Sequence, residues 1–371
     1  MNKWTYTTLG KISEIITGPF GSQLHQSDYV EQGIPVVMPQ DIDNRKVNYA
    51  SINYVSNEDA IRLERYKTII NDILYARRGD VEKHAFIKEK DNGVLCGTGC
   101  LRVRITTSEV EPEFISFFLN REETRKWLVT HAVGTNMPNL NTDILSDVPI
   151  AYPLLEEQRR IVQVLNSLDE KIALNSAVND NLEQQAYLIF ENMMAKAEAH
   201  RLKGKYTEAK FLASVITGKE DANFSVPNGK YKFFTCSNKP LYCNSYAFHT
   251  SSILIAGNGD FNVKHYSGKF NAYQRTYVLT PKKEYFALLY LASLYRINSF
   301  KSSSSGSIVK FITKSDVENI PVFIPDDTAY LDELNKLLLA QEQNTLENEL
   351  LVQLRDWLLP MLMNGQATIS D

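Results

Sequence analysis

Amide, imidazole and basic side chains gather in stretches where glycine, proline and aspartate predict loops. Three such stretches lie in the first half of the chain, at Gly18–Asp28, Ala76–His84 and Gly134–Asn141, and one lies in the second half, at Gly257–Arg275. Arginine, glutamine and asparagine can form paired hydrogen bonds with guanine or adenine edges, whereas lysine suits phosphate. An ordinary solvated loop would have a similar composition. The side chains that we single out for DNA contact are Ser22, Gln23, His25, Arg77, Arg78, Lys83, His84, Thr135, Asn136, Asn258, Lys264, His265, Lys269, Gln274 and Arg275.

The charge is distributed unevenly along the chain, although the net charge is only −4. Residues 201–327 contain 17 lysines and arginines against 9 aspartates and glutamates. Residues 1–150 contain 17 against 20, residues 151–200 contain 4 against 8, and residues 328–371 contain 2 against 7. A basic segment is typical of a surface that binds a polyanion, and also of one that is merely soluble.

Motifs for catalysis are missing from the sequence. There is no phosphate-binding GxxxxGK[ST] loop, no NPPY-like loop, no GxGxxG cofactor loop, no HExxH and no Ser-His-Asp pattern, and the six histidines are scattered. Asp169 and Lys171 lie on a predicted helix and form a surface pair rather than a nuclease centre. We therefore expect a chain with no cofactor and no catalysis of its own. The alternative is a DNA methyltransferase or nuclease whose catalytic site has diverged.

The four cysteines and the apolar runs bear on the compartment. Cys96, Cys100, Cys236 and Cys243 lack the CxxC spacing of a zinc site, so we expect free thiols and no metal. The start, MNKWTYTTLG, has no apolar signal-peptide core, and no apolar run is long enough to cross a membrane. These features predict a cytoplasmic protein that does not associate with membranes.

The chain contains an internal repeat. NDILYARRGD at Asn71–Asp80 returns as SSILIAGNGD at Ser251–Asp260, an offset of 180 residues. SEIITG at residue 13 returns as ASVITG at an offset of 200, and DVPIAYP at residue 147 returns as NIPVFIP at an offset of 172. Because the order is kept and the offset only shrinks, the second copy has the same plan with shorter loops.

A long helix is predicted at the end of each copy. Apolar residues recur there at spacings of three and four, which is the period of a coiled-coil stripe. In the first helix these are Ile161, Leu165, Leu168, Ile172, Leu182, Ala186 and Ile189, and in the second Leu334, Leu337, Leu338, Leu351, Leu354 and Leu358. Asn175 and Asn179 interrupt the first stripe, and polar residues in such a seam fix register at a cost in stability. Each stripe must be covered by its own globular unit or by the other helix, and we favour pairing of the two helices.

These features predict an α+β protein with a pseudo-twofold internal repeat. Two similar mixed α/β domains would be joined by two long helices that form an antiparallel coiled coil. We predict a first domain at residues 1–152, a central long helix at 153–200, a second domain at 201–326 and a C-terminal long helix at 327–371. Two similar domains at a fixed separation would read two similar targets at a fixed separation.

Over nearly all of its length the sequence resembles the specificity subunits of type I restriction–modification systems. The resemblance rests on LGKISEIITGPFGSQL, GIPVVMPQDI and NDILYARRGD in the first copy. Its most specific part is SDVPIAYPLLEEQRRIVQVLNSLDEKI, where EEQRRI follows proline and opens the long helix. The second helix lacks the EEQRRI opening.

The resemblance implies a role and a set of partners. Each domain would be a target recognition domain for one half of a split site in double-stranded DNA, with the helices setting the gap. The partners would be methyltransferase subunits that use S-adenosylmethionine and ATP-dependent restriction subunits. The implied site positions are the loop Gly18–Asp28, Arg77–Asp80 with Asn258–Asp260, and Gly134 with Gly306.

Overall fold

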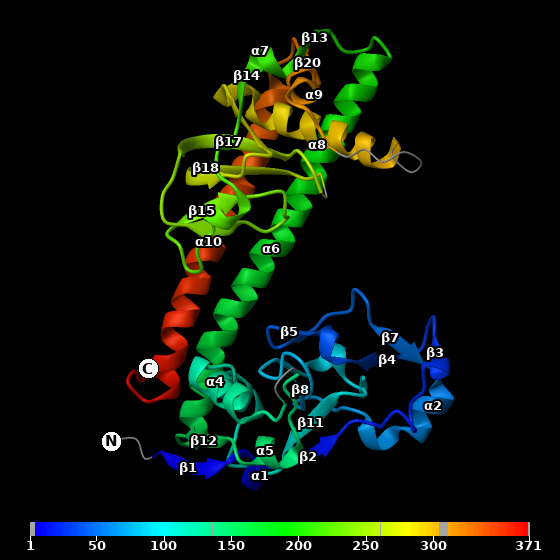
Figure 1. Ribbon diagram of the computed structural model, residues 1–371, viewed down its shortest axis with the longest axis vertical. Helices are drawn as coiled ribbons and strands as arrows, with labels where there is room; N and C mark the ends of the chain where they lie inside the picture. The colour runs from blue at the N-terminus through cyan, green and yellow to red at the C-terminus, as the bar shows by residue number, and fades with distance from the viewer. Residues whose placement is uncertain (1–3, 135–136, 260, 304–310, 370–371) are drawn as a thin grey trace. The chain divides into compact units, whose positions relative to one another are not determined.

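The computed structural model describes residues 4–134, 137–259, 261–303 and 311–369. The chain divides into two compact units, of which unit 1 contains Met1–Ile172 and Leu350–Asp371 and unit 2 contains Ala173–Glu349. Both units contain part of two long helices, α6 (Leu155–Glu198) and α10 (Ala329–Met363) (Figure 1). We call the remainder of unit 1 domain 1 and the remainder of unit 2 domain 2. The units divide within the two helices rather than at residues 152, 200 and 326, so the predicted domain boundaries stay a prediction.

Helix α6 begins where the sequence favours a helix start. Pro153 lies just before it, and Glu156 and Glu157 in its first turn suit the positive end of the helix dipole. In unit 1, Ile161 of α6 and Leu362 of α10 are buried in the same apolar core, together with residues of domain 1. The start of α6 is therefore covered by both its domain and the other helix.

In unit 2 the two helices contact each other through polar side chains. The Asn175 amide donates to Glu347 at 2.7 Å, and the Asn179 amide donates to Thr345 at 3.1 Å. As the residue number rises on α6, the number of its partner on α10 falls, so the helices are antiparallel. The predicted pairing of the helices is thus confirmed within unit 2, and the role of the two asparagines in fixing the register stays a prediction. Leu354, which the sequence placed in the apolar stripe, is 43% exposed.

Domain 1 contains short strands and helices. Its strands are β1 (Thr5–Thr8), β2 (Ser13–Thr17), β3 (Tyr29–Val30), β4 (Ile34–Val37), β5 (Ile42–Asp43), β6 (Lys46–Val47), β7 (Asn53–Val55), β8 (Ile73–Ala76), β9 (His84–Phe86), β10 (Leu95–Cys96), β11 (Cys100–Ile105) and β12 (Pro149–Tyr152). Its α-helices are α1 (Leu9–Ile12), α2 (Asn57–Arg62), α3 (Pro112–Leu119), α4 (Glu122–His131) and α5 (Thr142–Ser146). The strand orders are β2-β11-β8-β9, β10-β4-β7-β3, β1-β12 and β5-β6.

Domain 2 is built on one larger sheet. Its strands are β13 (Gly204–Glu208), β14 (Ala213–Thr217), β15 (Tyr231–Phe234), β16 (Leu241–Cys243), β17 (Phe248–Ala256), β18 (Val263–Ala272), β19 (Thr276–Pro281) and β20 (Pro321–Pro325). Its α-helices are α7 (Ala209–Leu212), α8 (Phe286–Ser303) and α9 (Lys314–Glu318). The strand orders are β14-β19-β17-β18-β15-β16 and β13-β20.

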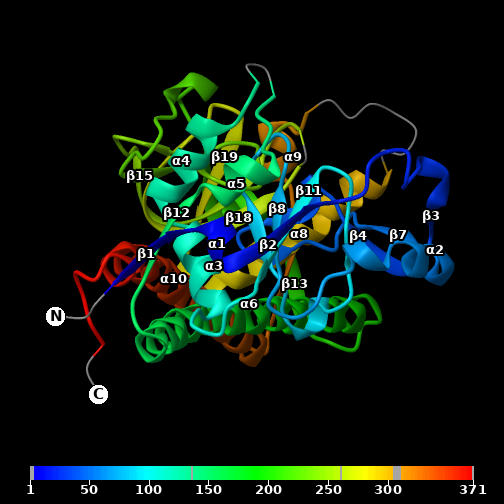
Figure 2. The same ribbon diagram turned by 90° about the horizontal axis from the view of Figure 1, so that it is seen from below.

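The repeat seen in the sequence is a repeat of topology. The order β2-β11-β8-β9 in domain 1 corresponds to β14-β19-β17-β18 in domain 2. Each domain also closes with a two-stranded antiparallel pair, β1-β12 or β13-β20. Figure 2, which views the chain from below, shows β2, β11 and β8 as neighbours in domain 1. The predicted α+β fold with an internal repeat is confirmed.

The repeated phrase ILYA/ILIA is the central strand of each domain. In β8, Ile73 and Tyr75 face one buried apolar core, whereas Leu74 and Ala76 face a second. Side chains alternate between the two faces of a strand, so a strand that is covered on both faces must be apolar at every position. In β17, Ile253 and Leu254 likewise belong to two different cores.

Helices α3 and α4 are separate, because Arg121 between them is extended (ψ 146°) and lays its guanidinium over the Phe118 ring. One element differs from the prediction. Residues 257–275, predicted as a polar loop, contain the ten-residue strand β18. Because β18 is hydrogen-bonded to β17 on one side and to β15 on the other, its backbone is paired although its side chains are polar.

Candidate nucleic-acid interface

Loops from separate parts of domain 1 meet at one end of its central sheet. The amide of Gly18 donates to the carbonyl of Cys100 at 2.9 Å, and that of Arg77 donates to Gly99 at 2.8 Å. The amide of Leu140 donates to the carbonyl of Arg77 at 2.9 Å. We call this group of loops rim 1, with residues 18–25, 77–83, 97–99 and 137–140.

Domain 2 builds its own rim with the same hydrogen bonds. Gly218 donates to the carbonyl of Thr276 at 3.0 Å, Gly257 donates to Arg275 at 2.8 Å, and Ile312 donates to Gly257 at 2.8 Å. Each bond has its counterpart in rim 1. We call the group rim 2, with residues 218–221, 235–237, 257–259, 273–276 and 311–312.

Both rims need a glycine where the central strand ends. Gly79 has φ +77° and Gly259 has φ +71°, a left-handed conformation that side chains disfavour. These glycines are equivalent positions of the repeated phrase. The glycine of the RGD and NGD triplets therefore turns the chain at the rim in both copies.

One backbone hydrogen bond that both rims contain joins a glycine and an arginine, but the two residue types have exchanged places between the rims. In rim 1 the donor residue is Arg77 and the acceptor residue is Gly99, whereas in rim 2 the donor is Gly257 and the acceptor is Arg275. A side chain at Gly257 would lie 2.7 Å from the Arg275 carbonyl oxygen, so that position is closed to larger residues. Each rim thus has one arginine at this bond. In rim 1 it directly follows the central strand β8, and in rim 2 it directly precedes β19.

The loop at the start of rim 1 carries exposed polar side chains. Ser22, Gln23 and His25 are exposed, as predicted for a contact surface. The loop is held from domain 1, because the Tyr66 hydroxyl donates to the Gln23 side chain at 2.8 Å and Arg62 donates to the Gln23 carbonyl at 2.6 Å. It is therefore an anchored loop with exposed polar tips.

The phrase that follows β8 contributes two arginines and a lysine to rim 1. Arg78 is exposed, whereas Arg77 is half-buried and donates through Nε to the Leu140 carbonyl at 3.3 Å. Lys83 forms an ion pair with Asp80 at 2.7 Å, and the hydrogen bond of this pair raises the pKa of Lys83. Thr135 and Asn136 lie outside the described residues, as do Asp260 and Gly306.

His84 was predicted to contact DNA, but it lies in the core of domain 1. Its side chain is 2% exposed, and its Nε2 donates to the Ser116 carbonyl at 3.0 Å. Burial, reinforced by the neighbouring charge of Arg45, lowers the pKa of His84 to about 3, so the ring is neutral. We remove His84 from the candidate interface.

Rim 2 brings together four of the predicted residues. Gln274 and Arg275 are exposed, and Asn258 is half-buried. Lys264 reaches the same rim, where its ammonium donates to the carbonyls of Thr235 and Ser237. Partial burial lowers the pKa of Lys264.

Two other predicted residues do not belong to rim 2. His265 points to the opposite face, where its ring packs against Tyr290 and its Nε2 lies 3.4 Å from the Gln341 side chain. Burial lowers the pKa of His265. Lys269 pairs with His249 in the β17–β18 ladder, and its ammonium lies 4.9 Å from the Tyr246 ring centre rather than among the residues of rim 2.

The sequence reasoning missed one prominent residue of rim 1. Phe20 is 58% exposed at the tip of the first loop, and the Arg77 guanidinium lies 6.0 Å from its ring centre. An exposed aromatic ring beside an arginine suits stacking on a base. Its position between Pro19 and Gly21 was the signal, because a phenylalanine flanked by proline and glycine is poorly placed to be buried as part of a strand.

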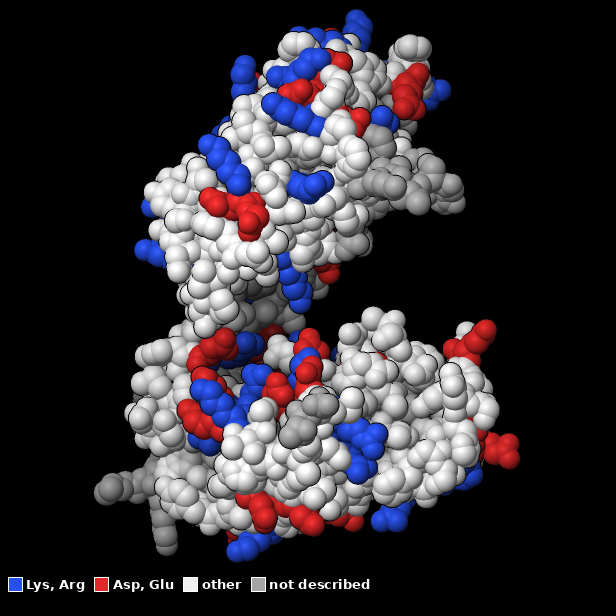
Figure 3. All heavy atoms as spheres, in the orientation of Figure 1, with Lys and Arg blue, Asp and Glu red and all other residues white. Residues whose placement is uncertain are grey.

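Charges of both signs are interspersed on the molecular face drawn in Figure 3. Within each unit, lysines and arginines alternate there with aspartates and glutamates rather than forming a continuous basic area. The basic balance of residues 201–327 is therefore spread over the surface of domain 2 on this face. This face therefore offers a polyanion separate cations rather than one continuous basic area.

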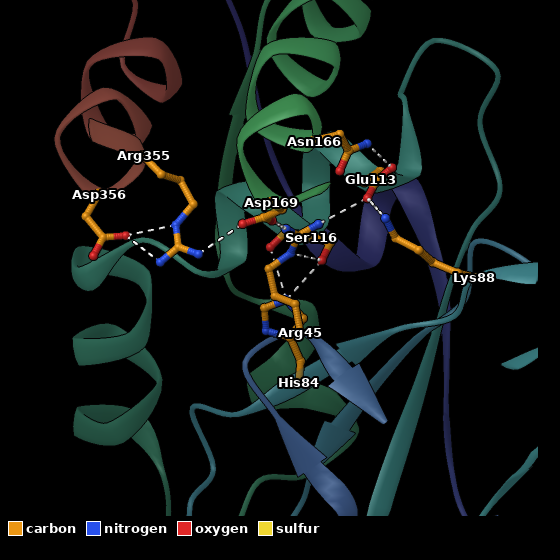
Figure 4. Close-up of polar contacts among 9 residues, drawn as sticks. All are labelled: Arg45, His84, Lys88, Glu113, Ser116, Asn166, Asp169, Arg355 and Asp356. Atoms are coloured by element: carbon orange, nitrogen blue, oxygen red, sulfur yellow. Dashed lines mark hydrogen bonds and ion pairs between the residues drawn. The ribbon is translucent and has the colours of Figure 1, made fainter. Parts of the chain in front are cut away.

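A largely buried ionic network lies where domain 1 meets α6 and α10 within unit 1. Figure 4 shows Arg45 among Ser116, Glu113 and Asp169, with Arg355 on the far side of Asp169. Burial lowers the pKa of Arg45 to about 10, although both carboxylates oppose the shift. Arg45 therefore remains charged at neutral pH. The sequence reasoning did not select it.

Among the described residues, no group of three or more histidine, cysteine, aspartate or glutamate side chains could hold a metal ion. The four cysteines are free thiols, and burial raises the pKa of Cys96 to about 12. No helix in the described part of the chain is long and apolar enough to span a membrane.

Two α+β domains of one design, carried on an antiparallel pair of helices, define a duplicated two-domain protein. The chain belongs to the family described as the type I restriction modification DNA specificity domain, whose model matches residues 1–184 and 195–351. The family resemblance inferred from the sequence is thereby confirmed.

Curated relatives are specificity subunits of type I restriction enzymes. The EcoDI subunit of Escherichia coli is 40% identical over 172 residues, which cover 44% of this chain and 38% of the relative. The HindI subunit of Haemophilus influenzae is 24% identical over 55% of this chain and 44% of the relative. Each of these matches spans less than half the length of the relative. The MjaIX subunit of Methanocaldococcus jannaschii is 22% identical over 99% of this chain and 94% of the relative.

A solved structure has the same fold over the whole chain. The crystal structure of the S subunit of a type I restriction–modification system from M. genitalium superimposes with a TM-score of 0.64 at 16% identity. The match covers 100% of this chain and 97% of that one.

Proposed function

We propose that this chain is the DNA-reading subunit of a type I restriction–modification complex. Rim 1 reads one half of a two-part site in double-stranded DNA, and rim 2 reads the other half. The observation that carries the proposal is the repetition of one hydrogen-bonded rim in two domains with different exposed side chains. The same backbone with different side chains is what two different half-sites require.

The rim side chains suit direct reading of base edges. Arg78 and Arg275 are exposed and can donate two hydrogen bonds to guanine, and the exposed Gln274 can form a pair of hydrogen bonds with adenine. Lys264, held at rim 2 by backbone carbonyls, is placed to contact a phosphate. Phosphate contacts position the protein and base contacts specify the sequence.

Catalysis then belongs to partner subunits. The sequence offers no cofactor loop, so methyl transfer would come from methyltransferase subunits and cleavage from ATP-dependent restriction subunits. The contact between α6 and α10 is polar at Asn175 and Asn179, and leucines of both helices are exposed. We therefore assign the binding surface for such partners to these two helices.

The test is to map methylated bases in a host that carries this chain and its methyltransferase. A two-part sequence, methylated only when both proteins are present, is the expected result. The purified chain alone should transfer no methyl group from labelled S-adenosylmethionine to duplex DNA. Methylation that does not depend on the chain, or methyl transfer by the chain alone, would contradict the proposal.

A further inference from the structure

The turn between β5 and β6 holds an arginine where glycine is usual. Asp43 pairs with Lys46, so Asn44 and Arg45 form a two-residue turn with φ values of 43° and 62°. Such turns favour asparagine followed by glycine, because a side chain at the second position strains the backbone. Contacts of the Arg45 side chain must therefore compensate the strain.

The Arg45 side chain makes three polar contacts and one aromatic contact. Nε donates to the Ser116 hydroxyl at 2.9 Å, and the terminal nitrogens lie 3.3 Å from Asp169 and 3.4 Å from Glu113 (Figure 4). The guanidinium carbon lies 3.4 Å from the centre of the Phe117 ring. With 8% of the side chain exposed, these contacts are largely desolvated.

Asp169 joins three elements of unit 1. One of its oxygens accepts from Arg45 of the β5–β6 turn, and the other accepts from Arg355 of α10 at 2.9 Å. Because Asp169 itself lies on α6, one carboxylate links domain 1 to both long helices. Glu113 adds a second link, since it accepts from Asn166 of α6 at 2.8 Å and pairs with Lys88 at 3.3 Å.

The network contains equal numbers of positive and negative side chains, and the two terminal nitrogens of the Arg45 guanidinium each bind a different carboxylate. Its cations are Arg45, Lys88 and Arg355, and its anions are Glu113, Asp169 and Asp356. Desolvation opposes the attraction at the buried members Arg45 and Glu113, so these contacts need not add stability, and we assign them a role in orientation. Domain 2 has a simpler link to α10, in which Lys232 pairs with Glu349.

We propose that Arg45 and Asp169 are positioning residues that fix the orientation of domain 1 on the two helices, and thereby the spacing of half-sites that the complex accepts. The inference rests on the proposed function. One base pair of added spacing turns a half-site by about 35° around the duplex. A domain held by directional contacts to two helices would reject such a rotation, whereas a loosened domain would tolerate it.

The experiment uses the complete complex of this chain with its methyltransferase subunits. Once the two half-sites are mapped, duplexes are prepared with the native spacer and with spacers one base pair shorter or longer. The variants are Arg45→Met, Asp169→Asn and the double variant. The ratio of methylation at the native spacer to that at the altered spacers should fall about 5- to 10-fold, a typical size for coupling between sites. The half-site sequences should stay the same.

The double variant and a surface control separate positioning from general weakening. Arg45 and Asp169 share one ion pair, so the loss in the double variant should be smaller than the two single losses combined, although Asp169→Asn also weakens the contact to Arg355. Glu122→Gln removes an exposed carboxylate that pairs with Lys126 on α4 of the same domain, and it should leave the ratio unchanged.

Three results would overturn the inference. The first is a lower melting temperature with an unchanged spacing ratio, which would make the network structural only. The second is an altered half-site sequence, and the third is failure of the nearly isosteric Asp169→Asn chain to fold. A wild-type complex that methylates no two-part sequence would instead refute the proposed function, and this inference with it.

Discussion

Single side chains at the rims decide which bases are read. Arg275 is exposed at rim 2, and its backbone carbonyl is fixed by the amide of Gly257 and the thiol of Cys236. The backbone position is thus set without help from the side chain. A substitution at Arg275 should therefore alter recognition and leave the fold of domain 2 intact.

Replacing Arg275 with alanine should relax the preference at one base pair of one half-site. Loss of two hydrogen bonds to a base should cost about 1–3 kcal/mol of binding free energy. Binding of the assembled complex to duplexes that vary at each position of the half-site measures the effect. Lys210→Ala is the matched control, because Lys210 is an exposed cation of domain 2 on α7, which precedes β14, whereas rim 2 begins after β14. Equal losses for both variants, or none for Arg275→Ala, would show that rim 2 does not face DNA.

The buried ring of His84 makes the stability of the protein sensitive to acid. Its pKa is lowered to about 3 by burial first and by Arg45 second, against about 6.5 for a free histidine. Between these pH values the unfolded chain binds a proton that the folded chain does not. The free energy of unfolding should therefore fall as the pH falls from about 6.5, by up to about 1.4 kcal/mol per pH unit.

The variant His84→Gln should lose less stability than the wild type between pH 6.5 and 5. Denaturant unfolding at several pH values gives this slope, and the comparison is made within the range where carboxylates remain charged. His131→Gln replaces an exposed histidine of the same domain and should keep the wild-type slope. Parallel pH profiles for His84→Gln and the wild type would contradict the burial of a neutral ring.

Strands and helices differ in how well the sequence predicted them. The duplicated phrase marked the central strands β8 and β17 as a repeated apolar run, which suits strands that are buried on both faces. The long helices were evident because apolar residues at spacings of three and four over many turns are specific to a helix. Strand β18 was missed, because its pairing partners β17 and β15 supply backbone bonds that side-chain patterns do not reveal.

The candidate interface could be predicted only in part, for a similar physical reason. Sequence marks a glycine-rich turn and its polar neighbours, so residues such as Arg78 and Gln274 were selected correctly as exposed rim residues. It does not tell which polar residue turns inward: His84 lies in β9, where every residue is buried, and the His265 ring packs against Tyr290 of α8. Arg45 escaped notice because its partners Glu113 and Asp169 are distant in sequence.

The whole chain repeats one design, so its two domains are expected to act on two half-sites at a defined distance. Within unit 2, Asn175 of α6 lies opposite Glu347 of α10. Adding one heptad after each of these residues would lengthen both antiparallel helices at the same level and keep the apolar stripe in phase. Seven residues add about 10 Å at about 1.5 Å per residue.

Lengthening both helices in this way should increase the gap between half-sites by about three base pairs, since DNA rises about 3.4 Å per base pair. Both half-site sequences should stay the same, because the rims are untouched. Methylation mapping of the lengthened complex gives gap and half-sites together, and a variant with two substitutions at the insertion points but no added length serves as control. Because three base pairs also rotate one half-site by about 100°, total methylation should fall while the preferred gap moves. An unchanged gap would show that the helices do not set the distance, and changed half-sites would show that they help to read bases.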